Sequence, residues 1–487
     1  MKKSQLVFVP CPVMGHVVSA VEFARLLINR HQHLSITVLI IRAPFDPNVQ
    51  AYTHSLTSSL SFPERLQFTL LPPHPDPTKC QTLHSSSLLN SLVETQKSNV
   101  RDAVSKLNSA TDSPWLAGFV VDMFCTAMID VATEFGVPTM VFFTSSAAFL
   151  GFKLHIHTLR ERDNVDTTEL NVKDSGTEFA IPCYETRVPV SVFPSVMFDR
   201  DWTLFFLNNA SRIKKAKGVI VNTFEELEPH ALHSFSKSDL TVYPIGPILN
   251  VMDTKTTMTQ RSDHVMEWLD DQPPSSVLFL CFGSRGYFDE QDQVTEIARA
   301  LERSGVHFLW SLRRPPPKGP AFEAPRDYSF SELEEVLPEG FLERTADIGR
   351  VMGWAPQPQI LAHRAVGGFV SHCGWNSILE SIYYGVPIAT WPLYAEQQLN
   401  AFQVVRELKI SVEICMDYRD ESDATVGKSG VISAGRIEKG IKEVMQKESE
   451  VRKKVKHMSE MSRRALMEGG SSYSCVGRFI HDTLNWK

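Results

Sequence analysis

Short runs of consecutive apolar residues, separated by stretches with helical spacing, constrain the fold of this chain more than any other feature. A strand that is apolar on both faces belongs in a parallel sheet that helices cover on both sides. Between the first two runs, residues 17–29 place apolar side chains at helical spacing. The first half is therefore predicted to form an α/β unit. Its strands are expected at residues 6–10, 36–41, 118–122, 138–143 and 218–223, the last of which should close that half.

The same alternation restarts in the second half of the chain. Apolar runs lie at residues 276–282, 307–312, 367–371 and 388–391, with helical segments at 291–303 and 375–384. A chain of 487 residues is also too long for one hydrophobic core. The pattern predicts two facing doubly wound α/β domains, residues 1–246 and 273–465, joined by a loop-rich linker at 247–272. Residues 314–327 and 417–430 are expected to be surface loops, the first of them mobile.

Composition excludes several classes of function. The formal net charge is −7 and no basic stripe is present, so a nucleic-acid partner is not expected. No run of about 18 apolar residues occurs, which predicts that the chain has no membrane span. The eight cysteines are scattered without a C-x-x-C pair, which argues against a zinc site and a disulfide framework. Reduced thiols, and an N-terminal apolar run broken by Pro10 and Pro12, favour a cytoplasmic protein.

The densest functional signal lies in residues 354–397. The apolar run at 367–371 leads through a short turn into the helix predicted at 375–384. The start of such a helix offers unpaired N–H groups and a positive dipole end, which bind a pyrophosphate. Asn376 and Ser377 add side-chain donors at this start, and His372 can donate to the same oxygens. Glu380, one turn further, could accept hydrogen bonds from both hydroxyls of a ribose.

Each of these residues also has a simpler interpretation. A Ser or Asn at a helix start is more often only a cap, and a lone His or Trp is more often part of the core. Their ordered occurrence within one short segment favours a nucleotide-sugar site instead. No G-x-G-x-x-G motif is present, so a nicotinamide site is not supported.

Two residues of the first half are candidates for a catalytic pair. His16 begins the first helix, whose positive end is expected to keep the imidazole neutral. Asp122 ends the run at 118–122, at the edge where open α/β sheets bind ligands. An Asp that holds a His fixes the tautomer that leaves the other ring nitrogen free as a base. The alternative is that Asp122 only caps the next helix.

Apolar residues near this pair are candidates for an acceptor pocket. Segments 80–92 and 183–200 are expected to form walls of the cleft. Apolar walls with few polar groups suit flat aromatic or terpenoid molecules and discriminate weakly among them. The candidate acceptor-binding residues are Met14, Met123, Phe124, Phe149 and Leu150.

Essentially the whole chain resembles the plant UDP-dependent glycosyltransferases of secondary metabolism, in the subgroup that glucosylates flavonoids, chalcones, other small phenols or terpenoids. Residues 222–228, 279–284, 337–345 and 394–402 are similar to family segments. The family's signature is matched at Trp354, Pro356, Gln357, Leu361, His363, Gly367, Phe369, His372, Gly374, Trp375, Asn376, Ser377, Glu380, Gly385, Pro387, Pro392, Glu396 and Gln397. The resemblance implies a GT-B arrangement, in which two Rossmann-like domains face each other across a cleft and residues 466–487 cross back onto the first domain.

The resemblance also implies roles in binding the donor. Trp354 stacks on the uracil and Ala355 pairs with it through backbone groups. The ribose is held by Gln357 and Glu380, and Gly374 belongs to the same UDP-sugar site. The pyrophosphate is held by Ser284, His372, Asn376 and Ser377, and the sugar hydroxyls by Trp375, Glu396 and Gln397. Gln397 resembles glucose-using members, because galactose users tend to have His there, whereas Glu396 stands where Asp is commoner. Thr144 resembles the position that touches the glucose 6-hydroxyl, although it could equally be a helix N-cap.

The implied reaction is the inverting transfer of glucose from UDP-glucose to an acceptor hydroxyl, which gives a β-O-glucoside. His16 would remove the hydroxyl proton, and the scheme requires neither a metal nor a cofactor besides the donor substrate. We expect the chain to act as a monomer. Two alternatives share the architecture: a non-catalytic nucleotide-sugar sensor and a UDP-sugar epimerase. The sequence departs from the family pattern at Val13, which replaces a glycine. A β-branched residue there should resist a positive φ and add bulk near the acceptor.

Overall fold

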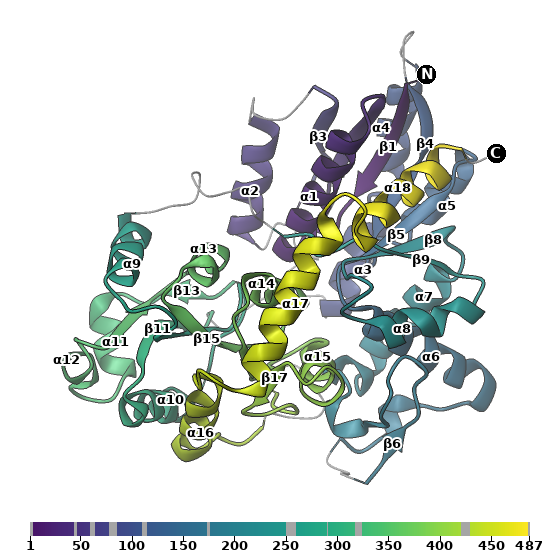
Figure 1. The fold of residues 1–487 in the computed structure, drawn as a ribbon. Helices are drawn as coiled ribbons and strands as arrows, with labels where there is room; N and C mark the ends of the chain where they lie inside the picture. Colours follow the sequence, from purple (N-terminus) through teal and green to yellow (C-terminus); the bar gives the residue numbers. More distant parts are fainter. Residues whose placement is uncertain are drawn as a thin grey trace.

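The computed structural model describes most of the chain in ten stretches. They are residues 3–42, 46–58, 64–76, 85–109, 114–172, 176–249, 260–289, 291–316, 324–419 and 429–485. Figure 1 shows the two halves of the chain lying next to each other, each built around its own sheet, with the C-terminal helices running between them.

The first half is built on a seven-stranded sheet with the order β3-β2-β1-β4-β5-β8-β9, and all of its pairings are parallel. Its strands are β1 (Ser4–Val9), β2 (Leu34–Ile40), β3 (Leu66–Leu70), β4 (Trp115–Asp122), β5 (Thr139–Phe143), β8 (Gly218–Val221) and β9 (Thr241–Pro244). The five predicted runs all form strands here. The expectation that residues 218–223 close this half is wrong, because β9 pairs with β8 and extends the sheet.

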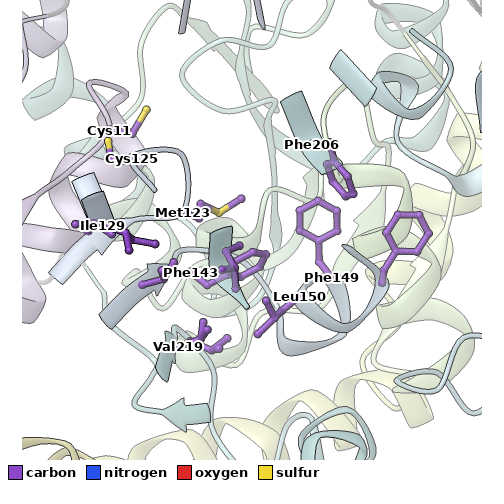
Figure 2. Close-up of a cluster of buried hydrophobic side chains, with 14 of the residues drawn as sticks. Cys11, Met123, Cys125, Ile129, Phe143, Phe149, Leu150, Phe206 and Val219 are labelled. Carbon is purple, nitrogen blue, oxygen red and sulfur yellow. The ribbon is translucent and has the colours of Figure 1, made fainter. Parts of the chain in front are cut away.

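Helices cover both faces of this sheet, as the continuous apolar runs require. Along β1, Val7 and Val9 lie in one core cluster, whereas Leu6 and Phe8 lie in the cluster on the opposite face. Figure 2 shows part of the first cluster, including Phe143, in β5. The helices are α1 (Met14–Arg30), α2 (Pro47–Ser58), α3 (Ser85–Glu94), α4 (Lys97–Ser109), α5 (Met128–Glu134), α6 (Ala147–Asp163), α7 (Arg200–Ile213) and α8 (Pro229–Ser234); a small antiparallel pair joins β6 (Glu178–Phe179) to β7 (Val188–Pro189).

The second half contains a six-stranded parallel sheet with the order β14-β11-β10-β15-β16-β17. Its strands are β10 (Val277–Cys281), β11 (His307–Ser311), β14 (Gly349–Met352), β15 (Val366–Ser371), β16 (Ile388–Thr390) and β17 (Ser411–Glu413). Its helices are α9 (Gln260–Asp270), α10 (Gln291–Ser304), α11 (Phe330–Val336), α12 (Phe341–Arg344), α13 (Gln357–Ala362), α14 (Trp375–Tyr384), α15 (Gln397–Phe402), α16 (Ala434–Val444) and α17 (Glu450–Leu466). Two parallel sheets with helices on their faces confirm the predicted α/β class.

Two expected loops differ from the structure. The linker prediction is wrong for residues 260–270, which form α9 and bury Leu269 in the core of the second half. Residues 250–259 of the same stretch lie outside the described residues. The ends of the loop expected at 314–327 pair as a short antiparallel hairpin of β12 (Arg313–Arg314) and β13 (Arg326–Asp327). Within the other expected loop, residues 420–428 lie outside the described part.

The last helix, α18 (Ser471–Leu484), lies against the first sheet. The ring of Phe479 is 5.6 Å from the rings of Phe23 and Tyr243, measured between centroids. In Figure 1, α17 leads from the second half towards α18 on the first half. None of the helices in the described stretches has both the length and the apolar character that crossing a membrane would demand.

Candidate active site

The strand order of each sheet reverses at one place, and the candidate site residues gather there. In the first sheet the reversal lies between β1 and β4, and in the second between β10 and β15. In open parallel sheets, ligands bind beyond the carboxyl ends of the strands at such a switch point. His16 follows β1 and Asp122 ends β4, whereas Ser284 follows β10 and His372 follows β15.

The first pair of residues is held together directly. His16 lies in the first turn of α1, and its Nδ1 is 2.7 Å from Oδ2 of Asp122, which is buried. The other carboxylate oxygen accepts from the backbone N–H of Phe124 at 2.9 Å, so both oxygens are fixed. Asp122 does not cap the next helix, because α5 begins at Met128 after Ala127. Within the described stretches, Nε2 of His16 has no hydrogen-bond partner and is free to accept a proton.

The pKa of His16 departs from the expectation. Burial lowers this pKa, but the charge and hydrogen bond of Asp122 and the charge of Glu396 raise it above its ordinary value of 6.5. The prediction that the helix end keeps the imidazole below its usual pKa is therefore wrong in direction. Two carboxylates face the ring, and their field outweighs the partial charge of one helix terminus.

Thr144 makes a contact with His16 that the sequence did not indicate. Its hydroxyl Oγ1 lies 3.0 Å from Nδ1 of His16, so it is a second polar contact of the ring beside Asp122. The N-cap alternative for Thr144 is wrong, because α6 is capped by Ser146, which accepts from the backbone N–H of Phe149 at 3.0 Å.

The start of α14 has the form expected of an anion site. Its N-cap is Gly374, which has no side chain, and no side chain caps the helix. The interpretation of Asn376 and Ser377 as mere caps is therefore not supported. A Cβ added at Gly374 would lie 2.5 Å from Nε2 of His372, and one at Gly283 would lie equally close. Glycine at both positions makes room for the imidazole.

His372 is electrostatically the opposite of His16. Burial lowers the pKa of His372 to about 4, so the ring is neutral at physiological pH. Its Nδ1 is buried and has no partner among the described residues. A neutral, partly unsatisfied imidazole beside an uncapped helix start can donate a hydrogen bond to an anionic oxygen without adding a charge.

The predicted ribose residues contact one another. Nε2 of Gln357 donates to Oε2 of Glu380 at 2.7 Å and to the hydroxyl of Ser377 at 2.8 Å. Burial raises the pKa of Glu380 to about 7, although the hydrogen bond from Gln357 opposes this rise. At the same end of the sheet, the side chain of Trp354 is 43% exposed, which leaves its ring available for stacking. Ala355 is buried beside it, and Ser284 lies exposed in the turn after β10.

The structure rules out the predicted sugar contact of the Trp375 ring and limits that of Gln397 to its amide NH₂. The indole of Trp375 is only 2% exposed and its Nε1 donates to the backbone carbonyl of Asn222 at 2.7 Å. The Trp375 ring therefore cannot grip a sugar hydroxyl, and only its backbone N–H at the helix start remains for a ligand. Oε1 of Gln397 accepts from the backbone N–H groups of Leu393 and Tyr394, which leaves its amide NH₂ for other partners.

Hydrogen bonds join the two halves of the chain at the candidate active site. The amide of Asn376 donates to the backbone carbonyl of Gly15 at 3.3 Å, next to His16. Glu396 accepts from the hydroxyl of Ser145 at 3.1 Å. The segment that carries His16 and the start of α14 therefore lie next to each other, one in each half of the chain.

Glu228 is a buried residue that joins the two halves of the chain by hydrogen bonds, and the sequence analysis missed it. It accepts from the backbone N–H groups of Ala147 and Ala148 at the start of α6, and from Nε2 of Gln403 in the second half. The signal was present, because residues 222–228 are similar to a family segment, but that resemblance assigned no contact to them. The position of α6, which follows Thr144, depends on this carboxylate.

The candidate acceptor residues divide into two groups. Met14 and Phe124 are partly exposed, and the ring centroid of Phe124 is 5.3 Å from that of His16. Met123 and Phe149 are mostly buried, and Leu150 has no exposed surface. The assignment of Leu150 to the acceptor site is wrong, because its side chain points into the core shown in Figure 2.

A cavity of about 220 Å³ opens beside Phe124, between α3 and α7. Within the predicted wall at residues 80–92, residues 86, 87 and 90 line it, whereas residues 80–84 lie outside the described stretches. The other predicted wall, 183–200, does not contribute to this cavity and buries side chains such as Val190 and Phe193 in the core. The lining residues are Ser86, Ser87, Asn90, Val93, Glu94, Phe124, Thr126, Ala127, Asp201, Leu204, Phe205, Asn208, Asn209 and Arg212.

The backbone at Val13 is unstrained. Its φ is −125° and its ψ is 135°, an extended conformation that β-branched residues adopt readily. The position does not require a positive φ, so the predicted resistance of a β-branched residue to that conformation has no consequence here. The side chain packs against the first core cluster, so its bulk, and not its backbone, distinguishes it from a glycine.

Comparisons with known proteins agree with this geometry. Residues 204–418 match the family model described as UDP-glucoronosyl and UDP-glucosyl transferase. The chain is 52% identical to UDP-glucose flavonoid 3-O-glucosyltransferase 6 of Fragaria ananassa, over 98% of each chain. It is 50% identical to UDP-glycosyltransferase 71A15 of Malus domestica, over 98% of this chain and 99% of that protein. Its fold is similar to that of Medicago truncatula UGT71G1 crystallised with UDP-glucose, with a TM-score of 0.85, 38% identity and 99% of each chain covered.

Proposed function

Since this chain belongs to the family of UDP-glucosyl and UDP-glucuronosyl transferases, we propose a division of labour across its two facing Rossmann-like domains. The enzyme transfers glucose from UDP-glucose to a hydroxyl of a small lipophilic acceptor, such as a flavonoid, and gives a β-O-glucoside. In our proposal, the second half binds the donor and the first half binds the acceptor and removes its proton. No observation favours the epimerase or the sensor.

The donor is bound by residues after β10 and β15 and around α13 and α14. The exposed ring of Trp354 stacks on the uracil, with Ala355 beside it, and Gln357 and Glu380 bind the ribose hydroxyls. The uncapped start of α14 binds the pyrophosphate, together with the neutral ring of His372. Ser284, Gly374, Asn376 and Ser377 complete that site, and Thr144, Glu396, Gln397 and the backbone of Trp375 face the sugar.

The transfer itself is a single displacement. Nε2 of His16 removes the proton from the acceptor hydroxyl, and that oxygen forms a bond to the anomeric carbon as the bond to the UDP oxygen breaks. The configuration inverts because attack and departure occur on opposite faces. Asp122 orients His16 and stabilises the imidazolium that forms. The N–H groups of α14 and His372 stabilise the charge that grows on the leaving diphosphate.

This scheme assigns no step to a metal ion. Among the described residues, no group of three or more His, Cys, Asp or Glu side chains is arranged to hold one. The charge that a divalent ion would neutralise elsewhere is instead met by the helix start and by uncharged donors.

One observation carries the assignment of the base: the 2.7 Å contact of His16 with Asp122 beside an imidazole nitrogen that is left free. The test is a mass-spectrometric screen of purified protein with UDP-glucose against flavonoids, chalcones, simple phenols and triterpenes. We expect the mass of an acceptor to increase by one hexose. In the NMR spectrum of the product, the anomeric proton should show the large diaxial coupling of a β-glucoside. His16→Ala should abolish the product, whereas His264→Ala, at an exposed position on α9, should not. An active His16→Ala protein would disprove the assignment.

Three further features remain proposals. We propose domain limits of 1–246 and 273–465, supported by the two sheets, with residues 466–487 returning to the first domain, supported by Phe479 in its core. A reducing, cytoplasmic location is supported by the free thiols of the seven described cysteines. A monomer is supported by the fact that one chain supplies both sides of the site.

A further inference from the structure

One charged side chain in the first half has no role in the reaction described above. Lys153 lies in α6 and is only 1% exposed, which places it among the largest fully buried side chains of the protein. Its ammonium group forms neither a hydrogen bond nor an ion pair with any residue that the structure describes. An ammonium without a counter-charge is costly to bury, so lysines are rarely found in this state without a reason.

The surroundings of Lys153 are aromatic. Its Nζ lies 4.3 Å from the ring centroid of Phe206 and 5.9 Å from that of Phe124. Both distances fall within the range of cation–π attraction. Ring faces attract a cation weakly, and they also accept a flat aromatic ligand. The ammonium is therefore held in place without being neutralised.

Phe124 connects this lysine to the reaction centre. Its ring is 5.3 Å from the ring of His16, between centroids, and it also lines the cavity between α3 and α7. The ammonium and the base thus lie near the same partly exposed phenylalanine. A flat acceptor with one hydroxyl at His16 and its ring against Phe124 would bring a more distant substituent towards Lys153.

The carboxylates that face Lys153 are already engaged. Asp122, at the end of β4, and Glu396, before α15, both act on its charge. Asp122 is held by His16 and the backbone N–H of Phe124, and Glu396 accepts from Ser145. From α7, the facing group is the ring of Phe206. None of these makes a direct ion pair with the ammonium in the described stretches.

We propose that Lys153 determines acceptor specificity by binding an anionic oxygen of the acceptor, either a carboxylate or an ionised phenol, at a distance from the hydroxyl that receives glucose. The inference rests on the proposed function, because it requires that the acceptor sits beside His16. The flexible four-carbon stem lets the ammonium turn from the ring of Phe206 to such an oxygen. The acceptor site is then not uniformly apolar, because the ammonium of Lys153 favours acidic phenols over neutral ones of the same shape.

The titration of Lys153 gives this site a pH dependence. Burial lowers the pKa of Lys153 to about 7, with the charges of Asp122 and Glu396 opposing the fall. The cationic form exists below this pKa, so the preference for an acceptor carboxylate, which is ionised at every pH tested, should be largest below pH about 7 and decline as the pH rises. An acidified phenol becomes anionic only as the pH rises, so the preference for it should pass through a maximum. The activity that depends on His16 shows the opposite trend and rises with pH, because His16 must be deprotonated to accept a proton. A ratio of two acceptors attacked at the same hydroxyl cancels the contribution of the base.

The test uses matched acceptors that share one reacting phenol. The first pair is a 4-hydroxycinnamic acid and its methyl ester, which tests a carboxylate. The second pair is a bisphenol whose remote hydroxyl is acidified by neighbouring fluorines and its unfluorinated parent, which tests an ionised phenol. For each pair, kcat/KM is measured from pH 6 to 9 with wild-type protein, Lys153→Met and Lys153→Arg. The measured quantity is the ratio of kcat/KM for the charged acceptor to that for the neutral one.

We expect Lys153→Met to lower this ratio by about ten- to a hundredfold for at least one pair, as loss of a buried charge partner does. Activity on the neutral member should be kept. For the carboxylate pair, Lys153→Arg should retain the preference and remove its decline above pH about 7, because arginine stays protonated. The pair that responds identifies the anion. A wild-type ratio no higher than that of Lys153→Met in both pairs overturns the proposal.

Two controls separate this proposal from others. If the protein were not a transferase, the neutral acceptors would not be turned over either. The specificity proposal predicts that they are. A purely structural role would lower both members of a pair equally and would lower the melting temperature of Lys153→Met. We expect that temperature to stay unchanged or to rise, because a buried charge has been replaced by an apolar side chain of similar length.

Discussion

The two histidines of the candidate active site, one from each half of the chain, lie in opposite electrostatic environments. His16, in the first half, has two carboxylates acting on it, and its pKa lies above the ordinary value. His372, in the second half, has burial without a carboxylate, and its pKa falls to about 4. In the proposed mechanism, the first ring takes up a proton during the reaction, whereas the second stays neutral and serves as a hydrogen-bond donor. The residue type is the same, and the environment assigns the role.

The two sides also differ in how they are built. The donor side is formed largely by one segment, in which a strand, an uncapped turn and a helix follow one another along the chain. The acceptor side joins residues that are distant in sequence, such as His16 and Asp122. The proposed donor side combines the backbone N–H groups at the start of α14 with several side chains that act separately, whereas the coupled side chains of His16 and Asp122 dominate the other side. Substitutions should therefore weaken binding gradually on the donor side and abolish the chemistry on the acceptor side.

The largest effect is expected for Asp122→Asn. Loss of the carboxylate removes the partner that orients His16 and stabilises its protonated form, so kcat should fall by about 10³–10⁴-fold. Steady-state kinetics at saturating donor and acceptor would measure this. Asp102→Asn, at an exposed position on α4, is the matched control and should be unaffected. A loss of less than about tenfold would mean that the pair does not drive the chemistry.

On the donor side, Glu380→Gln should weaken UDP binding by about 10- to 100-fold, as the loss of hydrogen bonds to a charged group does. The kcat at saturating UDP-glucose should change little. Because the pKa of Glu380 is about 7, wild-type affinity for UDP should increase as the pH rises from 6 to 8. Calorimetric titration at several pH values would measure both effects, with Glu448→Gln as the exposed control. A large loss of kcat in Glu380→Gln would remove the distinction between the two sides.

Trp354→Ala should weaken UDP binding by about five- to thirtyfold, because one base–aromatic stacking contact is lost. The fold should be unaffected, since the ring is substantially exposed. Trp354→Phe should recover most of the affinity, and Phe330→Ala, at another exposed aromatic, should have no effect. Equal losses for the Phe and Ala variants would show that the ring does not stack on the base.

The pH profile should respond to the second carboxylate near the base. In wild-type protein, kcat/KM should rise with pH through an apparent pKa above 6.5, because His16 must be deprotonated. Glu396→Gln removes a negative charge that raises this pKa, so its rising limb should move to lower pH by less than about one unit. Profiles measured on a neutral acceptor would test this. If the rising limb of the Glu396→Gln profile moved to higher pH, Glu396 could not be a group that raises the pKa of His16.

The smallest effect is expected for Val13→Gly. The backbone is already extended, so glycine fits without rearrangement, and the change acts by removing bulk three residues before His16. The product profile across a panel of phenols should change, while the Kd of UDP stays within about twofold of wild type. An unchanged profile would show that Val13 does not border the acceptor.

The sequence predicted the local structure of the proposed donor side better than that of the proposed acceptor side, for a physical reason. A helix that begins directly after a buried strand is visible in consecutive residues, and the glycine that ends α14, Gly385, has the expected left-handed conformation with a φ of 74°. The side of a helix that faces a cleft is not visible in this way. Leu150 and Trp375 are therefore close to the site in sequence but turned into the core, the latter because its N–H bonds to Asn222.

The strands that the sequence missed are mainly edge strands. β3 and β9 form the two edges of the first sheet, and each has exposed or half-buried positions along its length. Continuous apolar runs detect strands that are covered on both faces, so these strands lack the signal. The contacts of Thr144 and Glu228 were also beyond sequence reasoning, because each depends on side chains from distant segments that only the packed structure brings together.

The separation of chemistry from donor binding is the central claim, and one titration tests it most directly. Calorimetry would compare the Kd of UDP for Asp122→Asn with that of wild-type protein under identical conditions. The account predicts values within about twofold of each other, although the variant has lost nearly all turnover, since Asp122 touches His16 and not the donor. A Kd weakened by about tenfold or more, a free-energy loss of about 1.4 kcal/mol, would show that the two sides form one coupled site and would contradict this account.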